Sequence, residues 1–308
     1  MAAKPSKVQR IAVVYNPSSG RKSKVIEPSD IKRSLPPGVE LEWIALPPTG
    51  SAHLEWRESI TRGFDLVLVA GGDGTVMACA SVLLGNDIPL GILPHGTGNI
   101  LASSLSIPRA LPLALEVALH GERQWLDLGC ANGKLFALAA GFGADAAIFA
   151  KTNPRLKARF GLVAYLIGSR ALLSMRPDTF EIKVDAGKPV IRRGYGVIVG
   201  NLSRFRAVQL KWPGASLYDA QFEIAVIRSH PALGSVLAAE GRLVEWFMGQ
   251  RVTIRSRRRH LLERDGDVDG SCSTLNVSVI PRRIEICVPR IIPVKSWRTV
   301  FNAFSSPH

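Results

Sequence analysis

Cysteine is scarce in this chain of 308 residues, and long apolar runs are missing. The four cysteines are scattered, and no two of them have the spacing of a metal site or a redox pair. We therefore expect reduced thiols in a cytoplasmic protein. The first residues lack the apolar stretch of a secretory signal, and no segment is long and apolar enough to span a bilayer. Any contact with a membrane is then predicted to be peripheral.

Acidic residues are also few relative to basic ones. The chain has 25 Asp and Glu against 39 Lys and Arg, which gives a formal net charge of +14 at pH 7. Such an excess predicts an anionic partner, either a polyanion or a phosphorylated ligand. No zinc-finger, helix-turn-helix or RNA-binding motif accompanies the basic clusters, so we expect no nucleic-acid partner. The oligomeric state stays open between a monomer and a homodimer.

Two glycine-rich loops follow two short apolar strands. Residues 66–70 run into the loop 71–75, and residues 90–93 run into the loop 94–99. Glycine lets backbone N–H groups approach an anion closely, and the amino end of a following helix adds partial positive charge. The two loops therefore predict a phosphate cradle rather than two plain turns. The residues expected to line it are Gly71, Gly72, Asp73, Gly74, Thr75, Gly96, Thr97 and Asn99.

The first part of the chain, residues 1–123, is predicted to be an α/β nucleotide-binding domain. The predicted strands are 11–15, 39–44, 66–70 and 90–93, and the predicted helices are 51–62, 75–84 and 111–120. Short apolar strands that alternate with helices are typical of a parallel sheet with flanking helices. Ligands bind such sheets at the carboxyl ends of the strands. Both glycine loops lie there, as do Asn16 after the first strand and Thr49 after the second.

The second part, residues 124–290, is predicted to be an antiparallel β-sandwich. The predicted strands are 124–130, 134–140, 179–184, 190–199, 222–227, 252–256, 275–280 and 283–288, and the predicted helices are 155–173 and 233–248. Strands joined mostly by turns favour antiparallel pairing. The tail, residues 291–308, has apolar residues on one helical face, and we expect it to pack on the body rather than lie in a membrane.

Four segments together resemble the diacylglycerol kinase catalytic-domain family of lipid kinases, which shares its glycine loop with NAD kinases. They are Asn16-Pro17-Ser18-Ser19-Gly20, Gly71-Gly72-Asp73-Gly74-Thr75, Pro94-His95-Gly96-Thr97-Gly98-Asn99 and Asp265-Gly266-Asp267. Their order and separations fit that family over most of the chain. The resemblance implies the same two-domain plan, with the active site in the cleft between a nucleotide-binding domain and a lipid-substrate domain.

The resemblance also implies an activity. It indicates ATP-dependent transfer of the γ-phosphoryl group, with Mg²⁺, to the hydroxyl of a diacylglycerol-like or sphingoid lipid. The basic charge then favours a lipid substrate at an anionic membrane surface, reached by a cytoplasmic, peripherally associated protein. Two alternatives stay open: an NAD kinase, against which the loop 94–99 and the late acidic motif speak, and a non-catalytic nucleotide or lipid sensor on the same fold.

Three carboxylates are the expected catalytic residues. Asp73 is expected to hold Mg²⁺ or orient its loop, and it could also cap the helix that follows it. The resemblance points to Asp267 as the general base, with Asp269 as an alternative, although the family has glutamate at position 267. It also assigns Asp127 a supporting role. An acidic hairpin turn with no catalytic part is the competing interpretation for 265–269.

A structural Mg²⁺ is predicted at residues 216–221. Asp219 resembles an Asp-Gly turn of the family, with Ala220 in place of the glycine. Its carboxylate and backbone carbonyls of Ser216 and Gln221 would suit a hard cation. A turn without metal is an equal alternative. A further departure is Ile100, where the family commonly has aspartate, so no electrostatic role is expected at that position.

Overall fold

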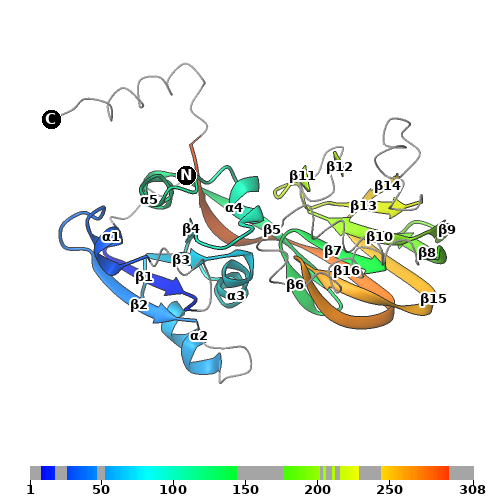
Figure 1. The fold of residues 1–308 in the computed structure, drawn as a ribbon, viewed down its shortest axis with the longest axis horizontal. Helices are drawn as coiled ribbons and strands as arrows, with labels where there is room; N and C mark the ends of the chain where they lie inside the picture. The colour runs from blue at the N-terminus through cyan, green and yellow to red at the C-terminus, as the bar shows by residue number, and fades with distance from the viewer. Residues whose placement is uncertain are drawn as a thin grey trace, which may run out of the picture.

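The computed structural model describes residues 8–17, 26–46, 53–143, 176–201, 204–205, 210–211, 216–228 and 244–290. These residues form two parts that lie side by side and are joined by long strands (Figure 1). Thr49, the predicted helix at 155–173 and the tail at 291–308 lie outside the described residues. None of the described helices has the length and apolar character of a transmembrane segment.

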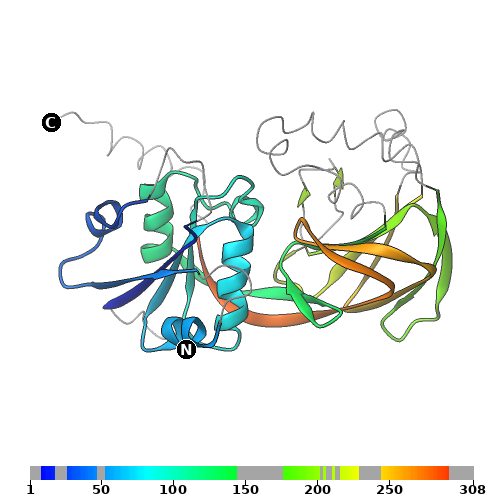
Figure 2. The ribbon, with the colours of Figure 1, turned by 60° about the horizontal axis from the view of Figure 1, so that its bottom comes forward.

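The first part is a parallel sheet with helices on both faces, as predicted (Figure 2). Its strands stand in the order β4-β3-β1-β2, and all the pairs among them are parallel. The strands are β1 (Arg10–Tyr15), β2 (Glu40–Ala45), β3 (Leu66–Gly71) and β4 (Leu90–Pro94). The helices are α1 (Pro28–Lys32), α2 (His53–Thr61), α3 (Asp73–Leu83), α4 (Ile100–Ser104) and α5 (Leu111–His120).

The strand order of this sheet marks where a ligand would bind. From β1 the chain moves to β2 on one side, and it then returns to build β3 and β4 on the other side. The order therefore reverses between β1 and β3. Ligands of such open sheets bind in the crevice outside the carboxyl ends of the strands at this reversal. Asn16 follows β1 there, and the loop 71–75 follows β3.

The second part consists of antiparallel strands around its own apolar core. They are β5 (Glu122–Ala131), β6 (Lys134–Phe136), β7 (Ala139–Gly143), β8 (Asp178–Val184), β9 (Val190–Gly194), β10 (Gly196–Gly200), β13 (Phe222–Ile227), β14 (Val244–Gly249), β15 (Arg251–Arg264) and β16 (Asp267–Val288). A short separate pair is formed by β11 (Arg204–Phe205) and β12 (Leu210–Lys211).

The sheet of the second part curls back on itself. The first half of β15 pairs with β8 and the second half with β7, with a break in register between Arg255 and His260. As a result, the edge strand β14 packs against β8. The closeness is seen at the end of β14, where a Cβ atom placed on Gly249 would lie 2.3 Å from the Val184 side chain. This curling encloses a core that includes Phe142, Phe180 and Ile224.

The strand β16 belongs to both parts. Its length of 22 residues takes it from the hairpin with β15, along β5, to β4, where Ile286 pairs in parallel with Leu90. Ile284 and Val288 are buried in the same apolar cluster as β1, β3 and β4. Residues 284–288 therefore complete the core of the first part. The predicted boundary between the domains, at residues 123 and 124, stays a prediction.

The predicted helix at 233–248 is wrong over its last residues, which form the strand β14. This segment pairs with β13 along its whole length, and Trp246 packs against a small cluster that contains Ile198 and Ala225. Pairing and packing between distant segments therefore override the local helical pattern. Residues 134–140 and 190–199 each form two strands rather than one, and the two predicted strands at 275–288 are parts of β16.

Phe136 provides a test of the second core. Its side chain is fully buried, stacks on Phe222 with ring centroids 5.7 Å apart, and occupies the space where a side chain at Gly129 would lie. Phe136→Ala should lower the free energy of unfolding by about 3–5 kcal/mol, because truncation leaves a cavity. Urea unfolding measures this value. Met248→Ala, at an exposed site, is the control and should change it by less than about 0.5 kcal/mol; equal losses would contradict the assignment of this core.

Candidate active site

The two glycine loops touch each other at their backbones. A Cβ atom placed on Gly96 would lie 2.4 Å from the Cα atom of Gly72, a separation that real side chains do not show. The N–H of His95 donates a hydrogen bond to the carbonyl oxygen of Gly71 at 3.0 Å. The close approach of β3 and β4 at their carboxyl ends therefore requires glycine at position 96, and it leaves little room for a side chain at position 72, where a Cβ atom would lie 3.2 Å from the Cα atom of Gly96. The prediction that these loops lie together is confirmed.

Asp73 joins the two loops through its side chain. Its carboxylate accepts hydrogen bonds from the backbone N–H groups of Ile100 at 3.0 Å and Leu101 at 2.9 Å. It thus caps the amino end of α4, whereas α3 begins after Gly72 without a side-chain cap. Of the roles expected for Asp73, the structure shows that it orients a loop. That loop is not its own loop, 71–75, but the neighbouring loop, 94–99. Its binding of Mg²⁺ stays a prediction.

Asn99 closes the second loop on itself. Its backbone has a left-handed φ of 50°, and its buried side chain both accepts from the N–H of Gly96 at 2.9 Å and donates to the carbonyl of Gly96 at 2.8 Å. Arg109 supports the same loop from outside, by donating to the carbonyl of Gly98 at 2.8 Å. Gly74, Thr97 and Gly98 are the exposed members of the two loops. They are therefore the best placed to reach a ligand.

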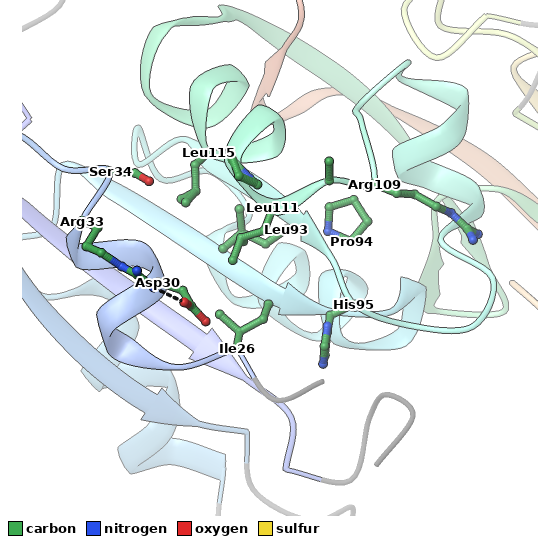
Figure 3. Close-up of a pocket in the computed structure, with 12 residues that line it drawn as sticks. Ile26, Asp30, Arg33, Ser34, Leu93, Pro94, His95, Arg109, Leu111 and Leu115 are labelled. Carbon is green, nitrogen blue, oxygen red and sulfur yellow. Dashed lines mark hydrogen bonds and ion pairs between the residues drawn. The ribbon is translucent and has the colours of Figure 1, made fainter. Parts of the chain in front are cut away.

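A cavity of about 640 Å³ opens beside the second loop, between α1, the end of β4 and the start of α5 (Figure 3). Its floor is apolar and includes Leu93, Leu111 and Leu115. Its rim carries His95 and the ion pair between Asp30 and Arg33, which are 2.7 Å apart. The size and the mixed lining suit a small organic ligand. Sequence reasoning missed this cavity, because its walls come from three separate segments.

The hairpin between β15 and β16 carries the late acidic motif. Asp265 and Gly266 both have positive φ angles, 51° and 95°, as a two-residue turn of this kind requires. The Asp265 carboxylate accepts hydrogen bonds from the N–H groups of Ala137 at 2.8 Å, Leu138 at 2.7 Å and Ala139 at 3.1 Å. Asp265 therefore fixes the hairpin to the connection between β6 and β7, a role that the sequence did not reveal.

Asp265 is buried, and its surroundings change its acidity. Burial raises the pKa of Asp265 to about 6; three N–H groups oppose this rise, and the negative charge of Asp73 adds to it as the smallest cause. The connection that holds Asp265 follows β6, and β6 packs against α3, the helix that begins at Asp73. The hairpin of the second part therefore lies on the side of the first part that carries the first glycine loop. Their convergence on one ligand stays a prediction.

Asp267 and Asp269 differ in their surroundings. Asp267 pairs with Arg264 through its backbone, and its side chain is exposed and forms no hydrogen bond or ion pair within the described residues. Asp269 is held by Lys134 at 2.7 Å and Arg264 at 2.6 Å. Burial alone would raise the pKa of Asp269, but the two cations outweigh it and lower the pKa. A carboxylate held in this way is a poor general base, so the geometry favours Asp267 of the two.

Asp127 acts through the backbone of two neighbouring segments. It is buried, and its carboxylate accepts from the N–H of Ala220 at 2.6 Å and the N–H of Arg282 at 2.9 Å. It therefore ties the turn after Leu217 to β16. This arrangement agrees with a positioning residue, and direct participation in chemistry stays a prediction.

The predicted metal turn contains a single carboxylate. The Asp219 side chain accepts from the N–H of Gln221 at 3.1 Å, and the Ser216 hydroxyl accepts from the N–H of Tyr218 at 3.2 Å. Ala220 has a left-handed φ of 55°, a conformation that favours glycine. No group of three His, Cys, Asp or Glu that could hold a metal occurs within the described ranges. A cation at this turn would depend on Asp219 and carbonyl oxygens, and it stays a prediction.

Asp73→Asn tests the link between the loops. The amide places one N–H₂ group against a backbone donor, so one capping hydrogen bond is lost. The free energy of unfolding should fall by about 1–3 kcal/mol. Urea unfolding measures the loss, and Glu116→Gln, at an exposed position of α5, is the control that removes a charge without a cap. If both variants have wild-type stability, Asp73 does not cap α4.

The pKa of Asp265 tests the approach of the two parts. Its carboxyl carbon should titrate near pH 6 in a ¹³C NMR experiment, because burial and Asp73 raise its pKa to about that value. In Asp73→Asn the pKa should move downward, since one of the two causes of the rise is gone. An unchanged pKa of Asp265 in the variant would show that Asp73 does not act on the hairpin.

Comparisons with known proteins agree with this geometry. A family model for the diacylglycerol kinase catalytic domain matches residues 10–131. The chain is 28% identical over 297 residues to a protein of Bacillus subtilis named diacylglycerol kinase, with 92% of this chain and 97% of the relative covered. It is 30% identical over 230 residues to a Mycobacterium tuberculosis protein of the same name, with 72% of this chain and 74% of the relative covered.

Solved structures show the same fold. A diacylglycerol kinase structure from Bacillus anthracis has a TM-score of 0.69 at 17% identity and covers 92% of this chain and 98% of its own. An NAD kinase from Archaeoglobus fulgidus, solved with ATP, has a TM-score of 0.55 at 15% identity and covers 97% of this chain and 100% of its own. The motifs, the fold and the relatives together place this chain in the diacylglycerol kinase catalytic-domain family.

Proposed function

We propose that this protein, a lipid kinase by its family, transfers the γ-phosphoryl group of ATP to the hydroxyl of a diacylglycerol-like or sphingoid lipid. The observation that carries the proposal is geometric: the two glycine loops meet at their backbones, and α3, which follows the first loop, packs against β6 beside the anchored acidic hairpin. We infer that a phosphate-binding loop and an acidic hairpin border one space. Phosphoryl transfer needs both, because the phosphates must be positioned and the attacking hydroxyl must lose a proton.

The glycine loops would hold the phosphates of ATP. The helix α3 starts at Asp73 and has 11 residues, so its amino end carries partial positive charge. Thr97 and the backbone of Gly74 are exposed beside it. The cavity behind His95 (Figure 3) has room for the nucleoside, with an apolar floor for the base and a polar rim for the sugar. Asn16 and Thr49 stay predicted contacts at the same edge of the sheet.

Mg²⁺ fits the acidic side of this space. Asp73 and Asp265 are the two carboxylates that would hold the ion, because a hard cation takes oxygen ligands. Both carboxylates already accept backbone N–H groups, which fixes their orientation. When bound with ATP, the ion would neutralise charge on the phosphates. Asp219 with carbonyl oxygens of Ser216 and Gln221 is the proposed site for a second, structural ion.

Asp267 is the proposed general base. It follows Asp265 and Gly266 in the hairpin, so the turn that anchors Asp265 also sets its position. Its carboxylate would take the proton of the lipid hydroxyl as that oxygen attacks the γ-phosphorus, and ADP would leave with the bridging oxygen. Asp127 supports this arrangement by fixing β16 at Arg282. Aspartate is shorter than glutamate by one methylene, so the hydroxyl must approach the turn closely.

The lipid would be reached by peripheral attachment to an anionic membrane surface. The net charge of +14 supports electrostatic attraction, which contributes about 1 kcal/mol for each basic residue near such a surface. An exposed basic run in β15, Arg257 to Arg259, is one part of this charge. NAD as the acceptor is disfavoured by the loop 94–99 and by the acidic hairpin.

The base assignment is tested with two isosteric variants of the hairpin. Asp267→Asn removes basicity and keeps size, so kcat should fall by about 10²–10⁴-fold. The KM for ATP should change little, because Asp267 belongs to the hairpin and not to the glycine loops. A coupled assay with a short-chain diacylglycerol measures both constants, and Asp267→Glu should retain activity.

Asp269→Asn is the matched control, since it removes a carboxylate two residues away. This variant should be less stable, because Lys134 and Arg264 lose their charged partner, and it should keep most of kcat. An active Asp267→Asn with an inactive Asp269→Asn would move the base to position 269. If both variants keep full activity, neither carboxylate is the base.

A further inference from the structure

A second cavity, of about 940 Å³, lies away from the glycine loops. It is bordered by the end of α4, the middle of α5, the start of β5 and the end of β16, next to the turn that contains Tyr218. None of its lining residues belongs to the two glycine loops or to the acidic hairpin. The proposed transfer reaction therefore assigns it no part.

Three arginines and no acidic residue line this cavity. They are Arg123, Arg282 and Arg290. Within the described residues the side chains of Arg282 and Arg290 form no ion pair, and Arg123 has only a long contact of 3.8 Å with Glu285. Three guanidinium groups around one cavity, largely without counter-charges, create a positive potential that favours an anion. Guanidinium groups also match phosphate oxygens in geometry.

The floor between these arginines is apolar. It includes Leu105, Val117 and Val288, with the half-buried ring of Trp125 at one side. Tyr218 is 47% exposed and borders the same cavity, so its ring adds to the apolar surface in reach of a ligand. A purely inorganic anion would leave this surface in contact with water. An anion that carries an apolar part would cover it.

The positions of the charged rim are fixed by the fold. Asp127 binds the backbone N–H of Arg282 on one side and that of Ala220, two residues after Tyr218, on the other. Arg290 follows the buried end of β16. The buried Asp127 carboxylate therefore fixes the backbone of two segments that border the cavity. A preformed site of this kind loses little conformational entropy when it binds a ligand.

We propose that this cavity binds the phosphate headgroup of an anionic phospholipid, with the start of the acyl chains against Trp125. The shared chemistry is a phosphate ester, which could also come from a small water-soluble metabolite, but the apolar floor favours the lipid. The proposal rests on the proposed function only in that both bring the protein to a lipid surface. Binding here would orient the protein on the membrane from a place outside the transfer site.

The test compares two double variants of equal charge. Arg282→Gln with Arg290→Gln removes two cavity charges, and Arg257→Gln with Arg258→Gln removes two exposed charges from β15. Dihexanoyl phosphatidate, a short-chain water-soluble phosphate ester, is titrated calorimetrically into each protein after thermal melts have shown that it is folded. The cavity variant should bind at least tenfold more weakly than wild type, and the β15 variant within twofold of wild type.

Two further ligands separate the sources of the phosphate. Dihexanoyl phosphatidylcholine, with a zwitterionic headgroup, should bind more weakly to wild type than the phosphatidate. Glycerol 3-phosphate, without acyl chains, should also bind more weakly. Equal or tighter binding would show that the ligand of the cavity is a soluble phosphate ester and not a lipid. Equal phosphatidate affinities of the two double variants would overturn the proposal.

Transfer to short-chain diacylglycerol is measured on the same preparations. The absence of transfer in every preparation counts against the proposed function alone. The affinity ratio of the two double variants then still decides on the cavity.

Discussion

The contact between the two glycine loops is the constraint on which the candidate site depends. Gly72 and Gly96 come so close that position 96 has no room for a Cβ atom, and a Cβ atom at position 72 would be tight, at 3.2 Å from the Cα atom of Gly96. Only at this separation can the Asp73 carboxylate reach the N–H groups of Ile100 and Leu101. One carboxylate thus sets the second loop and the start of α4 relative to the first loop. Any ligand that spans both loops meets a surface whose shape is already determined.

The strand β16 extends this constraint to the second part. Its far end pairs beside β4, the strand that carries the second loop, and its near end forms the hairpin with Asp265 and Asp267. The hairpin and the loop are therefore connected through one continuous strand, and Asp127 fixes that strand at Arg282. A base in the second part can then be positioned against phosphates held by the first.

Local patterns in the sequence predicted the elements that depend on local physics. The parallel strands, the helices α3 and α5 and the glycine loops were found from apolar runs and glycine spacing, and the structure confirms them. The partners of Asp73 were not found, because residues 100 and 101 are distant in sequence and contribute only backbone groups. For the same reason the anchoring role of Asp265 was missed. The signal that the sequence offered was the position of Asp265 directly before Gly266, a pair that is typical of a hairpin turn.

Pairing between distant segments explains the remaining difference. The residues of β14 fit a helical pattern, but the exposed edge of β13 offers them a complete set of hydrogen bonds. The arginine-lined cavity combines positions 123, 282 and 290, which no spacing rule connects. Sequence resemblance assigned roles to Asp267 and Asp127. The structure adds that Asp127 binds two backbone N–H groups and that the Asp267 side chain is exposed. The identity of the lipid depends on apolar surfaces that any sequence can build in many ways.

The most direct measurement of the central claim is the fate of the γ-phosphate. The purified protein is incubated with [γ-³²P]ATP, Mg²⁺ and mixed vesicles that contain diacylglycerol, ceramide and sphingosine in an anionic lipid, with NAD in the same reaction. The account predicts that the label enters a chloroform-soluble lipid phosphate, and that Asp267→Asn largely abolishes this transfer. Label found only in NADP, or only in inorganic phosphate, would contradict it.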